Sequence, residues 1–257
     1  FIMKLKHIES YLSSVTNAFP NPKILLEQYP TSAELAASII FLALQKGDLG
    51  PGRSALDLGC GTGMLALGCA IVDCDIVMAL DCDQDAIAIA IQNAETLELP
   101  IEFMIAKVND KGYLAHEVTI QQPANAKRPP RSKGRGYHTQ QRNLTMDPNA
   151  PDGLPLMDNC VDTVVTNPPF GTKHNAGMDV RFLKAATRLA RQTIYSFHKT
   201  STREYLLKLI EKWGFEAQVV AELKFDIPAT YRFHTHATRD IAVDLLRISK
   251  KPKSDNT

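Results

Sequence analysis

The residues best suited to chemistry form a short run, Asn167-Pro168-Pro169-Phe170. The run follows the apolar stretch 161–166, which we predict to be a buried strand. Pro168 biases Asn167 away from the α region, and each proline fixes its own φ near about −65°. The Asn167 side-chain oxygen and the Pro168 carbonyl can therefore converge on one amino group. Phe170 offers an aromatic face on which an unpaired base could stack.

An exocyclic amine of adenine suits this arrangement. Its nitrogen lone pair is delocalised into the ring, so the amine needs positioning before it can attack an electrophile. A methyl group on a sulfonium is already activated, so the attack requires no strong general base. The competing interpretation of the same four residues is an ordinary strand-ending turn with a buried phenylalanine.

A second motif lies earlier in the chain, where residues 57–63 read Asp-Leu-Gly-Cys-Gly-Thr-Gly. Glycines at a strand-to-helix turn allow a tight turn and a close approach of the backbone to a ligand. Asp81 ends the next predicted strand, where its carboxylate can accept both hydroxyls of a ribose. The spacing Gly-x-Gly-x-Gly disfavours NAD, whose pyrophosphate favours Gly-x-Gly-x-x-Gly. The motif predicts a nucleoside-type cofactor, and the competing interpretation is a tight turn without a ligand.

Asp57 stands just before the glycines and could orient backbone amides or offset a positive charge such as a sulfonium. The residues expected to contact the cofactor in this region are Asp57, Gly59, Gly61, Thr62, Gly63 and Asp81. Both motifs follow apolar strands. They would therefore meet at the carboxyl edge of one sheet, where open α/β sheets bind their ligands.

Short apolar runs that alternate with helical periods predict the sheet that positions these motifs. The expected strands are 54–58, 76–80, 101–108, 161–166, 193–197, 217–223 and 241–248. Capping-box patterns at Thr31 with Glu34 and at Ser201 with Glu204 predict the starts of two helices. The expected fold is α/β, a doubly wound, Rossmann-like sheet of seven strands with helices before it.

The chain is expected to form one catalytic domain with additions. Residues 1–46 are interpreted as an N-terminal helical addition, 47–250 as the catalytic domain and 251–257 as a tail. Within the domain, 118–146 contains no Asp or Glu but six Lys and Arg residues. We predict a flexible basic insertion there, because such a composition buries too little apolar surface to offset its ordering entropy.

The 257 residues carry a net charge of +1, from 29 Lys and Arg against 28 Asp and Glu. A near-neutral sum argues against a nucleic-acid partner. The distribution reverses that argument, because the six positive charges of the insertion leave a net charge of −5 on the rest. The insertion could contact phosphates, or it could be a solvated, disordered tract.

Five cysteines without a Cys-x-x-Cys pair predict neither a disulfide framework nor a zinc site, so no metal ligands are expected. No apolar run is long enough for a membrane span, and no secretory signal is visible. The expected location is the cytoplasm, the nucleus or both, with the nucleolus included, and not outside the cell.

Longer runs around both motifs point to one family. They are Glu-Gln-Tyr-Pro-Thr at 27–31, Asn-Pro-Pro-Phe-Gly-Thr-Lys at 167–173, Tyr-Ser-Phe-His-Lys-Thr-Ser-Thr-Arg-Glu at 195–204 and Phe-Asp-Ile-Pro-Ala-Thr-Tyr at 225–231. The chain thereby resembles the methyltransferase-like protein 5 family, within the class I methyltransferases. The resemblance implies N6-methylation of one adenosine in small-subunit (18S) ribosomal RNA, with S-adenosyl-L-methionine as cofactor. It also implies a heterodimer with a small zinc-binding activator subunit.

The resemblance further implies roles for single residues. Gln28 and Thr31 would close over the methionine end of the cofactor. The Asp that the family places after the third strand is absent, and Lys107-Val108-Asn109-Asp110 stands there instead. Val108, with Asn109 or Asp110, would then meet the cofactor adenine. Thr62 stands where familiar members of the family have Cys.

The candidates for contact with RNA are Lys173, His198, Lys199, Tyr231 and Phe233. His198 and Lys199 follow the fifth predicted strand, so they would face the RNA or form a solvated surface pair. Tyr231 and Phe233 lie in a loop that mixes aromatic and basic residues. That loop could grip unpaired nucleotides or simply cover the edge of the sheet.

The third predicted strand would form one edge of the sheet, with Ile101, Phe103 and Ile105 apolar on one side. An edge of this kind recruits another strand. It therefore favours an obligate partner, and the alternative is that the chain's own insertion covers it.

Two other functions stay open. A protein-glutamine methyltransferase would meet the same problem at its amide nitrogen, although that family typically carries Asn-Pro-Pro-Tyr. A non-catalytic RNA-binding scaffold would keep the fold without the cofactor, as the missing Asp near Val108 suggests.

Overall fold

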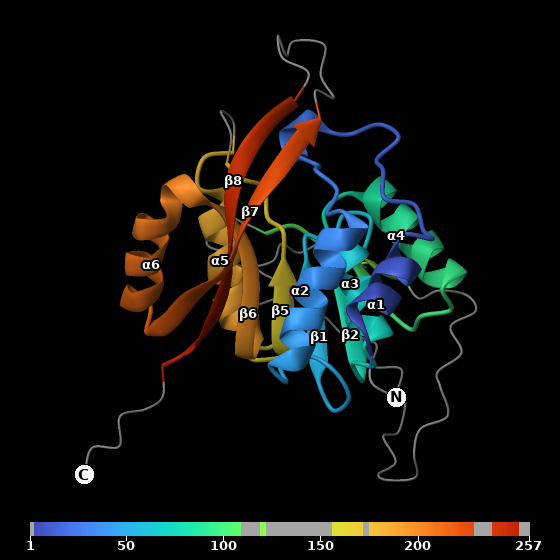
Figure 1. Cartoon of the computed structure of the whole chain (residues 1–257), viewed down its shortest axis with the longest axis horizontal. Helices are drawn as coiled ribbons and strands as arrows, with labels where there is room; N and C mark the ends of the chain where they lie inside the picture. The colour runs from blue at the N-terminus through green and yellow to red at the C-terminus, as the bar shows by residue number, and fades with distance from the viewer. Residues whose placement is uncertain (1–2, 109–118, 122–155, 172–174, 229–237, 252–257) are drawn as a thin grey trace.

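The structure is a computed structural model that describes residues 3–108, 119–121, 156–171, 175–228 and 238–251. Its strands are β1 (Ser54–Leu58), β2 (Ile76–Asp81), β3 (Glu102–Ile105), β4 (Thr119–Gln121), β5 (Val161–Thr166), β6 (Ala190–Lys199), β7 (Phe215–Pro228) and β8 (Thr238–Lys250). They form one sheet in the order β4-β3-β2-β1-β5-β6-β8-β7 (Figure 1).

All seven predicted strands are present. The neighbours among β3, β2, β1, β5 and β6 run parallel. β8 is antiparallel to both β6 and β7 and lies between them. This is the seven-stranded mixed sheet of a class I methyltransferase, so the predicted fold class is confirmed.

An eighth strand extends the sheet beyond the prediction. β4 pairs antiparallel with β3, from Phe103 opposite Gln121 to Ile105 opposite Thr119. Three residues of the predicted insertion, 119–121, thus pair with the open edge of β3, where a backbone gains ladder hydrogen bonds, and the flexible insertion itself stays a prediction. Residues 122–146 of that insertion lie outside the described residues. The edge that favoured a partner is paired with the chain's own segment, which was the alternative.

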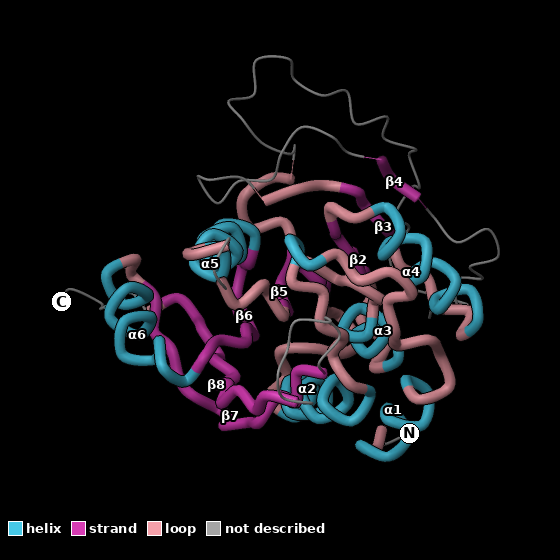
Figure 2. The backbone as a smooth tube through the Cα atoms, turned by 90° about the horizontal axis from the view of Figure 1, so that it is seen from above, coloured by secondary structure: helices cyan, strands magenta, loops and turns pink. Residues whose placement is uncertain are grey.

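Helices cover both faces of the sheet. They are α1 (Leu5–Leu12), α2 (Ala33–Gln45), α3 (Met64–Ile71), α4 (Gln84–Thr96), α5 (Met178–Leu189) and α6 (Arg203–Lys212), with 3-10 turns η1 (Ile24–Leu26) and η2 (Thr200–Thr202). α1 to α4 pack on one face, and α5 and α6 pack on the other (Figure 2). In β1, Ala55 joins the first apolar cluster and Leu56 the second, because successive strand residues point to opposite faces.

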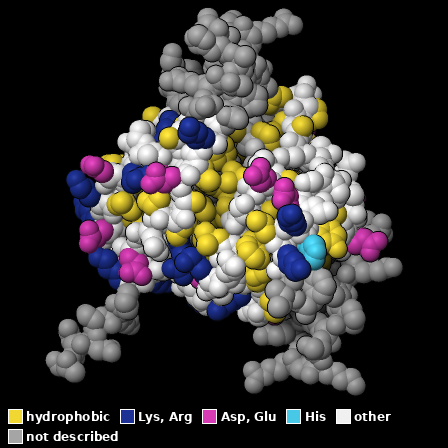
Figure 3. Space-filling model, in the orientation of Figure 1, with side chains coloured by type: hydrophobic (Ala, Val, Ile, Leu, Met, Phe, Trp, Pro, Cys, Tyr) yellow, Lys and Arg dark blue, Asp and Glu magenta, His cyan; other side chains and the backbone are white. Residues whose placement is uncertain are grey.

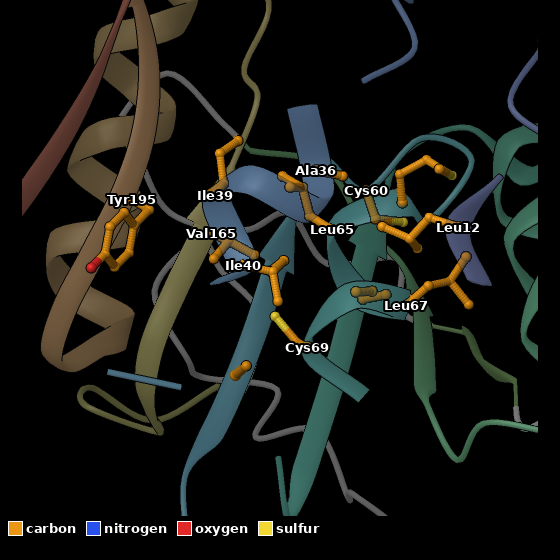
Figure 4. Close-up of a cluster of buried hydrophobic side chains, with 14 of the residues drawn as sticks. Leu12, Ala36, Ile39, Ile40, Cys60, Leu65, Leu67, Cys69, Val165 and Tyr195 are labelled. Atoms are coloured by element: carbon orange, nitrogen blue, oxygen red, sulfur yellow. The ribbon is translucent and has the colours of Figure 1, made fainter. Parts of the chain in front are cut away.

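The core on the first face extends into the N-terminal helices. Ile39 and Ile40 of α2 lie between Tyr195 of β6 and Leu65 of α3 (Figure 4). Ile8 of α1 is fully buried in the same cluster. The helices before residue 47 thus share the core of the sheet, and the predicted division into 1–46, 47–250 and 251–257 stays a prediction.

Both predicted capping boxes are wrong. α2 begins one residue later than predicted, and Ser32 is its N-cap, with Oγ accepting the N–H of Leu35 at 3.2 Å. Thr31 is therefore left for a contact with the active site. α6 follows the turn η2, and Thr202 at its N-cap makes no side-chain cap hydrogen bond.

A buried polar network anchors the chain between α2 and β1. Both oxygens of Asp48 accept hydrogen bonds from Arg247, at 2.8 and 3.0 Å. The Tyr195 hydroxyl donates to Asp48 Oδ2 at 2.6 Å, and Thr193 donates to Oδ1 at 3.2 Å. Burial by itself raises the pKa of Asp48, but the hydrogen bonds from Arg247 and Tyr195 hold that pKa below its usual value.

The surface in the view of Figure 1 is mixed in character. Hydrophobic side chains gather in the middle of this face, around α2, and most charged side chains lie toward its two sides (Figure 3). Among the described residues, no helix combines the length and the apolar character that crossing a membrane would need.

Candidate active site

The glycine turn joins β1 to α3 at the carboxyl edge of the sheet. The N–H groups of Gly59 and Cys60 donate to the Leu80 carbonyl at 2.7 and 2.9 Å, which ties the turn to β2. Gly59 has a φ of +78°, and a Cβ there would lie 2.7 Å from Phe182 Cε1. This position therefore requires glycine both for its backbone conformation and for the close approach of the Phe182 ring.

Asp81 ends β2 beside the turn, as predicted for a ribose ligand. Its Oδ2 accepts the N–H of Gly61 at 2.8 Å, and its Oδ1 accepts the N–H of Asp83 at 2.9 Å. Burial raises the pKa of Asp81, while these two backbone donors act in the opposite direction. The carboxylate is fixed in orientation, and each oxygen retains a further lone pair for a ligand.

Asp57 lies beneath the same turn and is 1% exposed. Its Oδ2 accepts the N–H of Ala66 in α3 at 2.9 Å, so it orients a backbone amide. Its buried Oδ1 has no hydrogen-bond partner in the part of the chain that the structure describes. Burial, together with the neighbouring charge of Asp81, raises the pKa of Asp57 to about 8. A buried carboxyl of this kind at the ligand edge of the sheet makes Asp57 a candidate functional residue.

A pocket with a cavity volume of about 100 Å³ opens between the glycine turn and the start of α5. It is lined by Phe19, Leu25, Leu26, Glu27, Gln28, Tyr29, Gly59, Gly61, Leu80, Asp81, Cys82, Ala106, Lys107, Val108, Asn167, Pro169, Asn175, Met178 and Phe182. The pocket brings together two motifs that are about a hundred residues apart in the sequence.

A smaller pocket, of about 30 Å³, shares Gly59, Gly61 and Asn167 with the larger one. The predicted residues Thr31, Asp57 and Thr62 line this second pocket. The predicted residues Gly63, Pro168 and Phe170 line neither pocket. The predicted cofactor residues thus divide between two adjoining spaces.

Sequence reasoning missed several residues of the larger pocket, namely Phe19, Leu25, Leu26, Met178 and Phe182. Phe182 carried only the signal of an apolar position in a helix. Phe182 lines the pocket because its ring packs on Gly59, which has no side chain. Only the three-dimensional structure reveals this contact. Phe19 similarly lies 3.1 Å from the position of a Cβ on Gly61.

Gln28 lines the pocket but is already engaged by the protein. Its Nε2 donates to Asp83 Oδ2 at 2.6 Å, and its Oε1 accepts the N–H of Lys23 at 2.7 Å. The Lys23 ammonium also pairs with Asp83 and, at 2.8 Å, with Asp85. Burial raises the pKa of Asp83, but the hydrogen bonds from Lys23 and Gln28 hold it below its usual value. Gln28 therefore fastens residues 23–28 to the start of α4.

Asn167 follows β5 at the boundary between the two pockets. Its Nδ2 donates to the Thr31 hydroxyl at 3.1 Å. This bond orients the carboxamide, and among the described residues no donor contacts Oδ1. The Asn167 oxygen is therefore available to accept from an amine, as the motif requires.

Phe170 differs from its predicted role as an open stacking face. Its ring is only 5% exposed. It packs edge to face on Phe225 of β7, with centroids 5.8 Å apart and an interplanar angle of 86°. Phe225 in turn contacts Phe197 of β6 at 5.4 Å. The long β7–β8 hairpin supplies this cover, which the local sequence around Phe170 does not reveal.

Both predicted interpretations placed His198 at the surface, and the structure corrects both. His198 is 1% exposed, with Nε2 2.8 Å from Ser196 Oγ and Nδ1 3.6 Å from Asp179 Oδ2. The separation from Asp179 is too long for a hydrogen bond, so Nδ1 has no hydrogen-bond partner among the described residues. Lys199 is partly exposed. The predicted site residues Asn109, Lys173, Tyr231 and Phe233 lie outside the described residues.

Comparison with known proteins places this site in a family. METTL5 of Danio rerio, an rRNA N(6)-adenosine-methyltransferase, is 36% identical over 248 residues, which cover 96% of this chain and 99% of that protein. Mettl5 of Drosophila melanogaster bears the same activity name and is 36% identical, covering 95% of this chain and 96% of that protein. The chain belongs to the METTL5 family. The predicted resemblance and S-adenosylmethionine as the cofactor are thereby confirmed.

Two further comparisons agree with a METTL5-family methyltransferase. The family model described as ribosomal protein L11 methyltransferase (PrmA) matches residues 38–121, which contain the glycine turn and Asp81 but not Asn167. The crystal structure of PH1948 from Pyrococcus horikoshii, proposed there to be an RNA methyltransferase, has a TM-score of 0.69 and 25% identity. It covers 98% of this chain and 100% of that one.

Proposed function

We propose that this METTL5-family chain transfers a methyl group from S-adenosylmethionine to N6 of an adenosine in small-subunit (18S) ribosomal RNA. The observation that carries the proposal is Asn167, whose carboxamide is oriented by Thr31 at the mouth of a pocket that also holds Asp81. The names of the relatives support the choice of substrate.

The pocket fits the cofactor chemically. Asp81 offers a fixed carboxylate to ribose hydroxyls, and the Phe182 ring packs closely on Gly59 in the lining of the same pocket. A positively charged group nearby would favour the ionised form of Asp57, whose buried Oδ1 has no hydrogen-bond partner among the described residues. Val108 lines the pocket at the end expected for adenine. When bound, S-adenosylmethionine supplies a methyl group activated by its sulfonium.

The substrate amine is held by this chain. Asn167 Oδ1 and the Pro168 carbonyl accept the two N–H groups of adenine N6, which favours a pyramidal nitrogen with a directed lone pair. Solvent would take the N6 proton that is released when the held nitrogen accepts the methyl group. No residue with a strongly basic side chain is required.

The decisive test compares rRNA nucleosides by mass spectrometry, with mapping of the modified position, in cells with and without the protein. Loss of one N6-methyladenosine is expected, and an unchanged level would refute the proposal. With purified protein, Asn167→Ala should keep S-adenosylmethionine affinity near wild type while methyl transfer falls at least about 100-fold. Retained turnover would refute the role of Asn167.

A protein substrate is the second candidate, because the PrmA model matches the cofactor half and because Phe170 is covered by Phe225. Methylation of a release-factor peptide, with none of an RNA hairpin, would favour it. A non-catalytic scaffold would give no heat on titration with S-adenosylmethionine. That titration should use the chain together with its expected partner.

The remaining assignments extend the same proposal. We propose a heterodimer with a small zinc-binding activator subunit, which rests on the family resemblance, since β4 already pairs with part of the β3 edge. Co-expression and size-exclusion chromatography test it. The insertion 118–146, with Lys173, Lys199, Tyr231 and Phe233, is proposed to contact rRNA. We propose the nucleus, including the nucleolus, or the cytoplasm as the location.

A further inference from the structure

Two neighbouring aliphatic side chains are exposed on the turn η1. Ile24 is 57% exposed and Leu25 is 68% exposed. Among the described residues, the other large exposed hydrophobic side chains, Tyr11, Ile76, Met157 and Tyr205, are each isolated in the sequence. Single exposed hydrophobic residues need no explanation, but an adjacent pair at the mouth of a ligand pocket does.

One member of the pair, Leu25, lines the candidate site, and Ile24 is its neighbour in the sequence. Leu25 and Leu26 line the same pocket as Asn167 and Asp81. The blue segment between α1 and α2 runs across the top of the sheet, at the edge where the glycine turn lies (Figure 1). A group held at Asn167 thus shares its pocket with side chains of η1.

Hydrogen bonds and an ion pair on two sides of η1 hold the exposed pair in place. On one side, Asn175 Nδ2 donates to the Leu25 carbonyl at 2.7 Å and to Glu27 Oε1 at 3.1 Å. On the other side, Lys23 and Gln28 bind Asp83. The exposure of Ile24 and Leu25 is thus a property of an anchored turn rather than of a loose chain end.

We propose that Ile24 and Leu25 pack against the bases that flank the target adenosine, and so hold that adenosine out of its stack. This inference rests on the proposed function. An adenosine that enters the pocket leaves the faces of its neighbours exposed, and aliphatic wedges are side chains that proteins insert at such positions. An isolated small substrate would have no flanking groups to fill this place.

The test uses the complete protein with its expected partner and an rRNA fragment that the wild type methylates. The variants are Ile24→Ser and Leu25→Ser, with Ile76→Ser and Tyr205→Ser as controls at exposed positions outside the pocket. One fragment carries 2-aminopurine at the target position, because its fluorescence rises when the base leaves the stack. S-adenosylmethionine affinity and thermal unfolding are measured for every variant.

Each η1 variant should raise the KM for the fragment about tenfold and reduce the fluorescence rise, while the controls stay near wild type. Ile24→Ser lies outside the pocket lining and should leave S-adenosylmethionine affinity within about twofold of wild type. Leu25→Met, which keeps an apolar side chain, should leave the KM for the fragment and the fluorescence rise near wild type.

If the wild type methylates the fragment and the η1 variants show the same KM and fluorescence rise as the wild type, this inference is overturned and the proposed function is not. If the wild type methylates no RNA, the proposed function fails and takes the inference with it. Loss of binding to the activator subunit, with RNA binding intact, would assign the pair to a protein contact and also overturn the inference.

Discussion

Asp48 and Asp57 are both almost fully buried, yet the protein treats their charges in opposite ways. Asp48 accepts hydrogen bonds from Arg247, Tyr195 and Thr193, and its pKa lies below the usual value. Asp57 accepts one backbone N–H and leaves Oδ1 unsatisfied, and burial raises its pKa to about 8. The chain itself neutralises the first carboxylate and leaves the second to a proton or a ligand.

The difference separates stability from function within one sheet. The Asp48 network joins the end of α2 to β6 and β8 through complete hydrogen bonding, which is what a structural anchor needs. At the carboxyl edge, Asp57 and Asn167 keep acceptor capacity unused by the described residues. Incomplete satisfaction costs stability, and it is retained where a ligand can supply the missing partner.

The largest expected effect comes from opening the Asp48 network. Arg247→Met leaves Asp48 buried without its cation, so the free energy of unfolding should fall by about 3–5 kcal/mol. Urea unfolding at pH 7 measures the loss. Arg53→Met, which removes an exposed hydrogen bond to Gln192, should cost less than about 0.5 kcal/mol. Equal losses in the two variants would remove the distinction between anchor and surface.

The pH dependence of stability should have opposite signs at the two carboxyls. Folded Asp57 keeps its proton up to about pH 8, whereas the unfolded group releases it near about pH 4. The folded state binds more protons between these values, so stability falls as pH rises, by at most about 1.4 kcal/mol per pH unit. Asp57→Asn should flatten this decline in urea unfolding followed from pH 4.5 to about 8.

Asp48 provides the matched control for that measurement. Its folded pKa is lowered, so its contribution is present above the unfolded pKa and is lost as pH falls through the folded pKa. Asp48→Asn should flatten the acid limb and leave the slope above about pH 5 unchanged. If both variants change the free energy of unfolding in the same pH range, the contrast between the two aspartates is wrong.

The smallest expected effects come from removing one hydroxyl group in each of the two regions. Thr31→Val removes the acceptor that orients Asn167, so turnover should fall about tenfold with little loss of stability, and Thr31→Ser should restore it. Thr193→Val, in the Asp48 network, should lower the free energy of unfolding by about 1 kcal/mol and leave turnover unchanged. Methylation assays and urea unfolding of both variants check this crossed pattern.

Patterns among neighbouring residues were sufficient to predict where the strands and the glycine turn lie. Alternation and turn residues located 54–58 and 161–166 at the bounds of β1 and β5. The position of Asp81 after β2 follows from the same pattern, because the carboxyl ends of parallel strands share one edge. These features depend on sequence neighbours, so the sequence contains the information for them.

The failures share a different cause. Phe170 is covered by Phe225, which lies 55 positions later on another strand. His198 is buried beside Asp179 of α5. Thr31 does not cap α2 but accepts a hydrogen bond from Asn167. Each outcome is set by a contact between distant segments, which periodicity and capping rules do not encode.

The position of β8 inside the sheet gives the chain a late closing step. β8 lies between β6 and β7, and its Arg247 reaches back 199 residues to Asp48. During synthesis, the ladder edges of β6 and β7 that face β8, and the Asp48 carboxylate, stay unpaired until β8 has left the ribosome. A message truncated before residue 238 would therefore yield a product that aggregates rather than a shorter enzyme, because two unpaired edges are exposed together.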